Sequence, residues 1–390
     1  MRVLVVHNRY SSRVPSGENL AVDDEVRWLR DAGVDVVVHE VSNDDMLDPG
    51  PLAKLRGGAA AVWSSPAARD VRRLLDAHRP DIVHVHNLFP LLTGSVPTAA
   101  RRRGIPVVWT VHNRRARCVA GGNFRDGAPC HECRPGWRVP GLVHACYGGS
   151  AAASAAVTAA STAFRISARR GGVTAIAISR AMARWVETEA GIPPDRVRVK
   201  YNGVARPATE VPPAETGHSV VFLGRLATYK GLRLLLDAWT RADVDDELLV
   251  VGDGDLADEV RVAASRARIR LLPQVGPDQV SEVLAAARVV VVPSTWDEPF
   301  GRVAAEALAH GRPVVTTGTG GLSEIVDESC GWVTGIDPDR MAAAINEAVT
   351  SDDAVATRGR QARDRHTERF SPEATTADLL SLYADVQATA

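Results

Sequence analysis

The chain has 390 residues, which is enough for two or three domains. Its 46 Lys and Arg nearly balance its 47 Asp and Glu, so no excess of positive charge favours binding to nucleic acid. The first residues, MRVLVVHNRY, lack the apolar run and cleavage site of a signal peptide, and no stretch is apolar enough to span a bilayer. These features predict a cytoplasmic protein.

Short Val-rich strands alternate with helical patterns in the first half of the chain. RVLVV precedes a predicted helix at about residues 19–31, VDVVVHE precedes one at 67–78, and DIVHVH precedes one at 95–103. PVVWTVH, VTAIAIS and RVRVKYNGV continue the series. Continuous apolar strands separated by helices are typical of parallel sheets covered on both faces, so this half is predicted to be a doubly wound α/β domain.

The second half repeats this rhythm with HSVVFLGR, ELLVVGDG, IRLLPQV, RVVVVPS, RPVVTT and GWVTG. A Pro-rich polar linker, residues 207–219, separates the halves. We predict domains at 1–205 and 206–373, with a cleft between them and a C-terminal helix at 374–388 that packs back on the first domain. Ligands of such sheets bind at the carboxyl ends of the strands.

Two cations follow the first strand of the second half. In VVFLGRLATYKG, Arg225 leaves the strand and Lys230 lies five residues later at a helix start. Two cations beside a helix N-terminus can bind a diphosphate, although a solvated Arg and Lys around a turn fit these residues equally well. The chain has no GxxxxGK[ST] loop, so it is not a P-loop nucleotidase.

Two acids eight residues apart mark DEPFGRVAAEAL, residues 297–308. Glu298 is expected in the loop after RVVVVPS, and Glu306 about two turns into the next helix. A carboxylate on a helix that points into a cleft can bind neighbouring hydroxyls, as on a ribose, and the N–H groups of Phe300 and Gly301 can donate to the same ligand. An ordinary amphipathic helix with surface acids would not account for the Pro, Phe and Gly between them.

These motifs together resemble a known family. EPFGRVAAEAL resembles the Glu-x7-Glu motif of retaining glycosyltransferases of family 4, which have the GT-B fold, and GRLATYKG resembles their pyrophosphate-binding segment. VVPSTWDEPFG and GTGGLSEIV fit in order, so the resemblance covers nearly the whole chain. It implies two Rossmann-like domains facing a cleft, and transfer of a hexosyl or N-acetylhexosaminyl group, with retention, from a nucleoside-diphosphate sugar to a hydroxyl acceptor. A glycan, a lipid-linked sugar or a small natural product would serve as acceptor.

The resemblance also implies a donor site in the second half. It assigns the diphosphate to Arg225 and Lys230, the ribose to Glu306, and the sugar to Glu298 with the amides of Phe300 and Gly301. Backbone near Val275 would contact the base. Arg302 stands where the family usually has an apolar residue, and it could reach the ligand or face solvent.

The first half is expected to bind the acceptor. Ser16-Gly17-Glu18 resembles a Gly-Gly-x-Glu element of the family but keeps one Gly, so Gly17 is expected near the diphosphate or the sugar. WTVHN ends a strand with His112, which matches the active-site His of the family. His86, at the end of DIVHVH, fits function and packing equally. The leaving diphosphate is expected to act as the base while Arg225, Lys230, Glu298 and His112 assist, so that no metal is needed.

Four of the five cysteines lie within one segment of the acceptor half: Cys118, Cys130, Cys133 and Cys146. A Cys-x2-Cys pair between two outer cysteines fits a structural zinc site, and buried thiols in a long loop are the alternative. Family members linked to surface-polysaccharide assembly have a similar segment, which does not fix the role of the cysteines.

Two other functions fit the same features. One is a nucleotide-sugar epimerase or hydrolase of the same fold, which would consume donor without an acceptor. The other is a sugar-binding protein without chemistry, which would have little use for cations placed to bind a diphosphate. The expected partners are therefore a nucleoside-diphosphate sugar and a hydroxylated acceptor but no nucleic acid, with membrane contact if the acceptor is lipid-linked.

Overall fold

The computed structural model describes residues 1–12, 16–46, 61–134, 137–265 and 268–389. The chain divides into two compact units. The first contains Met1–Asn123, Cys130–Tyr201 and Thr375–Ala390, and the second contains Phe124–Pro129 and Asn202–Ala374.

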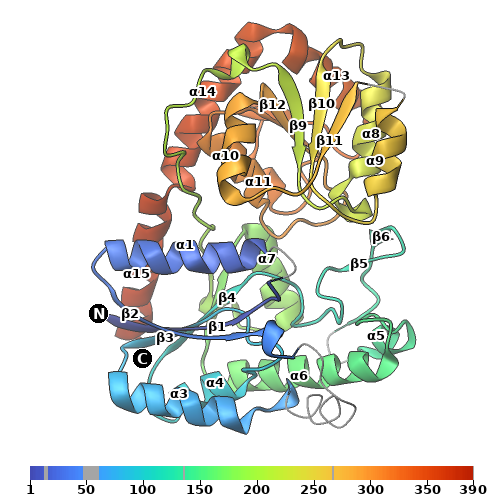
Figure 1. The fold of residues 1–390 in the computed structure, drawn as a ribbon. Helices are drawn as coiled ribbons and strands as arrows, with labels where there is room; N and C mark the ends of the chain where they lie inside the picture. Colours follow the sequence, from blue (N-terminus) through green and yellow to red (C-terminus); the bar gives the residue numbers. More distant parts are fainter. Residues whose placement is uncertain (13–15, 47–60, 135–136, 266–267, 390) are drawn as a thin grey trace. The chain divides into compact units, whose positions relative to one another are not determined.

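The first unit is built on a six-stranded parallel sheet in the order β2-β1-β3-β4-β7-β8 (Figure 1). Its strands are β1 (Arg2–Arg9), β2 (Asp35–Ser42), β3 (Ile82–Val85), β4 (Val107–Val111), β7 (Thr174–Ala177) and β8 (Val197–Val199). β3 and β4 are buried along their whole length, which explains why each is apolar except for one residue, His84 in β3 and Thr110 in β4.

Helices cover both faces of this sheet: α1 (Gly17–Asp31), α3 (Ser65–His78), α4 (Ser95–Arg101), α6 (Ala151–Arg170), α7 (Arg180–Trp185) and α15 (Pro372–Ala388). The short helix α5 (Val139–Val143) packs on α6. α1 and α15 pack on one face, and α3 and α4 lie on the other (Figure 1). Ser16 and Ser64 cap α1 and α3, since each hydroxyl accepts a hydrogen bond from a backbone N–H three residues later.

The second unit has a parallel six-stranded sheet in the order β11-β10-β9-β12-β13-β14. Its strands are β9 (Ser219–Leu223), β10 (Glu247–Val251), β11 (Ile269–Leu272), β12 (Val289–Val292), β13 (Val314–Thr316) and β14 (Gly331–Val333). Its helices are α8 (Leu232–Arg241), α9 (Ala257–Ala264), α10 (Pro277–Ala286), α11 (Arg302–Ala309), α12 (Leu322–Ile325), α13 (Pro338–Thr350) and α14 (Asp352–Arg369). Figure 1 shows α8 and α9 on one side of the sheet and α10, α11 and α14 on the other.

The predicted fold class is confirmed, because both halves are parallel sheets covered by helices. Local details differ from the sequence pattern. The strand expected in RVRVKYNGV is limited to β8, and the predicted linker contains a short 3-10 turn at Ala214–Thr216. The cysteine segment contains a small antiparallel hairpin, β5 (Phe124–Arg125) with β6 (Ala128–Pro129), which the alternating pattern does not predict.

Candidate active site

In the second unit, the carboxyl ends of β9 and β12 bring Lys230 and Glu298 together. Lys230 ends a 3-10 turn, η5 (Thr228–Lys230), after β9, and Glu298 lies in the loop after β12. Gly231 allows this approach: its φ is +74°, and a Cβ there would lie 1.7 Å from the carbonyl oxygen of Pro293. Any other residue would push the two loops apart.

The Lys230 ammonium contacts both carboxylate oxygens of Glu298, at 2.9 Å to Oε1 and 3.0 Å to Oε2. Ser294 and Trp296 each donate a further hydrogen bond of 2.8 Å to Oε2. Burial alone would raise the pKa of Glu298, but the Lys230 charge and these hydrogen bonds hold that pKa below its usual value. Glu298 is therefore an ionised carboxylate although only 7% of its surface is exposed.

A carboxylate has about four lone-pair positions. Among the described residues, three donors contact Oε2 of Glu298 and one contacts Oε1, which leaves Oε1 a position for one more donor. Lys230 has three N–H groups, and two of them suffice for Glu298. The rings of Tyr229 and Trp296 lie 5.8 and 5.7 Å from its ammonium, which also favours a cation there.

The other predicted donor residues lie around the same sheet edge. Arg225 is exposed directly after β9, and Val275 lies in the loop between β11 and α10. Phe300 is buried and packs on Phe370 at 6.0 Å between ring centroids, so its side chain belongs to the core and its backbone is what a ligand could contact. Gly301 has a φ of +107° at the N-terminus of α11, and a Cβ there would lie 2.5 Å from Leu322.

Glu306 and Arg302 form an ion pair of 2.8 Å across one turn of α11. Their side chains are 18% and 20% exposed. The expectation that Arg302 either reaches a ligand or faces solvent is therefore incomplete: in this structure it holds the carboxylate that was assigned to the ribose.

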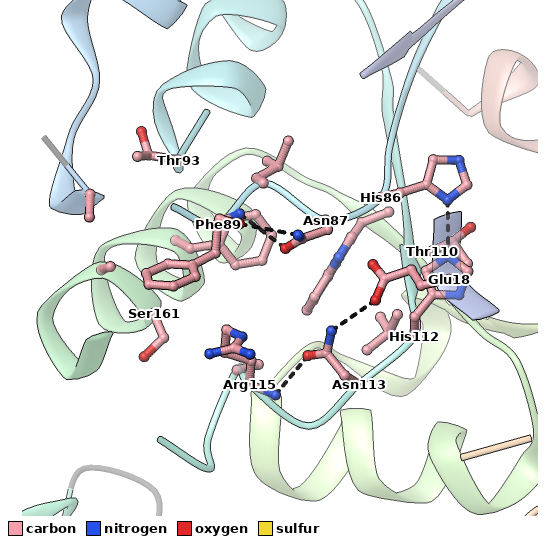
Figure 2. Close-up of a pocket in the computed structure, with 17 residues that line it drawn as sticks. Glu18, His86, Asn87, Phe89, Thr93, Thr110, His112, Asn113, Arg115 and Ser161 are labelled. Carbon is pink, nitrogen blue, oxygen red and sulfur yellow. Dashed lines mark hydrogen bonds between the residues drawn. The ribbon is translucent and has the colours of Figure 1, made fainter. Parts of the chain in front are cut away.

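The first unit contains a cavity of about 70 Å³ at the carboxyl ends of β3 and β4 (Figure 2). His86 lies just beyond β3, His112 and Asn113 lie beyond β4, and Glu18 comes from the first turn of α1. Figure 2 also shows Arg115 beside the cavity. Polar groups thus gather at the sheet edge where parallel α/β sheets bind ligands.

Glu18 accepts a hydrogen bond of 3.3 Å from the side-chain amide of Asn113. Burial raises the pKa of Glu18 to about 7. Gly17 is exposed at the start of α1, next to the Ser16 cap. The preceding residues 13–15 of this predicted loop lie outside the described part of the chain.

His112 is hydrogen-bonded to His86, with 3.1 Å between Nε2 of His112 and Nδ1 of His86. Burial lowers the pKa of His112 to about 3 and that of His86 well below its usual value, so both rings are neutral at pH 7. The sequence left His86 undecided between function and packing, and the structure places it directly behind the predicted active-site residue.

Sequence reasoning missed the buried charges behind these rings. Glu25 of α1 pairs with Lys200, and its Oε1 lies 3.4 Å from both Nδ1 of His84 and Nε2 of His86. The His-Val-His spacing in and after β3 was a usable signal, since residues two apart in a strand share one face. Glu25 and Lys200 are 175 residues apart and leave no such local pattern.

The four clustered cysteines are free thiols gathered in one folded segment. Cys118 Sγ accepts from the Asn123 amide at 3.4 Å, and the Asn123 carbonyl accepts from the Cys130 amide at 2.7 Å. Within the described residues, the sole set of three metal-ligating groups with atoms within 4.8 Å of one another is Glu25, His84 and His86. The zinc site therefore stays a prediction.

Comparison with known proteins gives the family. Residues 16–206 match the model of "Glycosyltransferase Family 4", and residues 217–351 match that of "Glycosyl transferases group 1". An alpha-maltose-1-phosphate synthase of Mycobacterium tuberculosis is 30% identical over 99% of this chain and 100% of the relative. The chain belongs to glycosyltransferase family 4. It is a glycosyltransferase that uses a nucleotide-sugar donor, and the retaining class expected from its motifs agrees with the family.

Solved structures support the fold of this glycosyltransferase. Sucrose-phosphate synthase from Thermosynechococcus elongatus matches with a TM-score of 0.71 and 19% identity over all of both chains. HepE of Anabaena, in complex with UDP and glucose, matches with a TM-score of 0.66 and 19% identity, over 99% of this chain and 100% of that one. A phosphatidyl-myo-inositol mannosyltransferase of Mycobacterium tuberculosis is 33% identical over 44% of this chain and 48% of the relative. No helix among the described residues is long and apolar enough to cross a membrane.

Proposed function

We propose that this glycosyltransferase transfers a hexosyl or N-acetylhexosaminyl group from a nucleoside-diphosphate sugar bound to the second unit. The observation that carries the proposal is the Lys230–Glu298 pair at the ends of β9 and β12, with Arg225 exposed after β9. This arrangement combines cations for a diphosphate with an ionised acid for sugar hydroxyls. A HepE structure contains UDP-glucose, which makes uridine diphosphate sugars the first donors to test.

Arg225 and the third N–H of Lys230 would bind the diphosphate, because charge-assisted hydrogen bonds to phosphate are among the strongest in proteins. The open position on Glu298 Oε1 would accept a donor-sugar hydroxyl. Glu306 would accept hydrogen bonds from the ribose hydroxyls, with Arg302 one turn earlier on α11 orienting its carboxylate. Backbone N–H groups at Phe300 and Gly301 would complete the sugar site.

In the proposed reaction, the bond between the anomeric carbon and the diphosphate oxygen breaks as the acceptor hydroxyl attacks from the same face. The hydroxyl proton passes to the departing phosphate oxygen, so the leaving group is the base and the anomeric configuration is retained. Arg225 and Lys230 stabilise the charge that develops on this oxygen, and each contributes about 3 kcal/mol on the scale of one preorganised donor. Two side-chain cations take the place of a metal, so a chelator should leave turnover unchanged.

His112 would bind a hydroxyl of the donor sugar or of the acceptor at the cavity in the first unit. Its neutral ring suits hydrogen bonding to an uncharged hydroxyl. The acceptor would be a hydroxylated glycan, lipid-linked sugar or small natural product.

The test is a matrix of UDP-, GDP- and ADP-hexoses against candidate acceptors, with nucleotide release and glycoside formation measured together. The anomeric configuration of the product should match that of the donor by proton coupling constants. Arg225→Met should lower turnover by orders of magnitude, whereas Arg233→Met, which removes an exposed cation paired with Glu259 on the same unit, should not. Nucleotide release without any glycoside would favour the hydrolase alternative, and an inverted product would refute the proposed reaction.

A further inference from the structure

A chain of buried polar groups runs behind His112 in the first unit. His112 Nε2 lies 3.1 Å from His86 Nδ1, and His86 Nε2 lies 3.4 Å from Glu25 Oε1. Glu25 ends the chain with an ion pair to Lys200 through its other oxygen. Glu25, His86 and Lys200 are 7%, 2% and 4% exposed, so bulk water cannot screen their interactions effectively.

The charges in this chain select one arrangement of protons. Burial alone would raise the pKa of Glu25, but the Lys200 charge holds it below its usual value, so Glu25 is ionised. An ionised carboxylate beside Nε2 of neutral His86 favours the proton on that nitrogen. Nδ1 of His86 is then a bare acceptor, and within the described part of the chain its hydrogen-bond partner is Nε2 of His112, which must carry the proton.

The same groups could suggest a metal site, since Glu25, His84 and His86 place their ligand atoms close together. Two contacts argue against it. The Lys200 ammonium already compensates the charge of Glu25, and a divalent cation would be repelled by it at short range. Nδ1 of His84 also has a partner, the Tyr383 hydroxyl at 2.6 Å.

We propose that Glu25 is a positioning residue that fixes His112, through His86, in the tautomer with its proton on Nε2, so that Nδ1 is presented to a substrate hydroxyl as a hydrogen-bond acceptor. The part that concerns the substrate rests on the proposed function. The part that concerns the tautomer of His112 rests only on the buried residues Glu25, His86 and Lys200. His112 lines the cavity of the first unit, so a ligand in that cavity would meet this residue. Nδ1 is the ring nitrogen of His112 that the contact with His86 does not use.

The direct test is nitrogen NMR of the full chain labelled with ¹⁵N-histidine, which distinguishes bare from protonated ring nitrogens. The chain has 11 histidines, and spectra of His112→Gln and His86→Gln would assign the two rings by difference. His112 should show a protonated Nε2 and a bare Nδ1 at pH 7, and His86 should show the same pattern. A protonated Nδ1 on His112, or a doubly protonated ring, would overturn the proposal.

A paired variant tests whether Glu25 is the cause. Glu25→Gln combined with Lys200→Met removes both buried charges at once, so no unpaired charge is left behind. His112 should then populate both tautomers, and kcat should fall in proportion to the correctly oriented fraction, by about twofold if half of the rings are misoriented, with a smaller change in KM. Tyr383→Phe is the matched control, because it removes a hydrogen bond to His84 and leaves the His86–His112 contact intact.

The readouts separate this proposal from the proposed function. An unchanged His112 tautomer in the paired variant would refute the role of Glu25 even in an active enzyme. The expected tautomers in an enzyme that transfers no sugar would support the positioning role and count against the proposed function. If the paired variant does not fold, the spectrum of the natural chain still decides, since the wrong tautomer there is sufficient to reject the proposal.

Discussion

Replacing Lys230 by Met should destabilise the protein and abolish most of its turnover for two separable reasons. The first is structural. Lys230 is the counter-ion of Glu298, whose side chain is 9% exposed, and loss of one member of a fully buried pair costs about 3–5 kcal/mol. The side chain of Lys230 is 28% exposed, so solvent screens part of the interaction, and we expect about 2 kcal/mol. For a unit of this size that corresponds to a decrease in Tm of about 4–8 °C.

The second reason is catalytic. Loss of one group that stabilises developing charge lowers kcat by about 10²–10³-fold. The double variant Lys230→Met, Glu298→Gln separates the two effects, because it removes the uncompensated carboxylate but does not restore the cation. Its Tm should recover most of the loss, while its turnover should stay low.

Differential scanning calorimetry and a nucleotide-release assay on the natural chain and these variants measure both quantities. The Lys230 charge lowers the pKa of Glu298, so the pair stabilises the fold at neutral pH, and that contribution is lost as the pH falls through the folded-state pKa. The Tm values of the natural chain and of Lys230→Met should therefore converge in acid. If the double variant is as unstable as the single one, the buried charge of Glu298 is not the cause, and normal turnover in either variant would refute the donor site.

Three further results are expected. Glu306→Gln should weaken binding of the nucleoside diphosphate about tenfold in calorimetry, because a hydrogen bond to a charged group is lost. Arg302→Gln should weaken this binding less, and equal effects of the two substitutions would contradict the assignment of Glu306 to the ribose. Burial raises the pKa of Glu18 from 4.5 to about 7, so between these pH values the folded state holds a proton on Glu18 that the unfolded state has lost. The free energy of unfolding should therefore decrease as the pH rises through this range. Glu18→Gln should flatten the dependence of Tm on pH from 5 to 8, and an unaltered slope would show that Glu18 titrates normally. If the cysteine segment binds zinc, elemental analysis should find about one equivalent, and Cys130→Ser with Cys133→Ser should remove it; metal-free protein purified under reducing conditions would leave the thiols as packing.

The fold could be predicted because its signals are local. Strands such as β3, β4 and β12 are buried along their whole length, so β12 appears in the sequence as an unbroken apolar run, and β3 and β4 are each interrupted by one polar residue, His84 and Thr110. The donor-side residues could be predicted for a related reason: Arg225 and Glu298 follow strands directly, and the carboxyl ends of parallel strands share one edge of a sheet.

The interactions that tune these residues could not be predicted in the same way. Lys230 and Glu298 were assigned separately to the diphosphate and the sugar, and their contact with each other depends on how two loops 68 residues apart pack. From the sequence, Arg302 was interpreted only by the residue type that the family has at this position. Its ion pair with Glu306 depends instead on the two residues lying four apart on one helix. The pair of Glu25 and Lys200 has no such spacing, so nothing short of the three-dimensional structure shows it.

The position of α15 has a consequence for the order in which the protein folds during synthesis. Leu379, Leu382, Tyr383 and Val386 belong to the same buried cluster as strands β1 and β3, so the core of the first unit includes side chains from the last helix of this sequence. The ribosome completes residues 202–374 before it adds them. The nascent first unit must therefore wait, with an apolar face uncovered, while the second unit is translated and can already fold. The first unit is the one that chaperones should hold longest, and a released chain that ends at residue 374 should remain sensitive to protease in its first unit although its second unit is resistant.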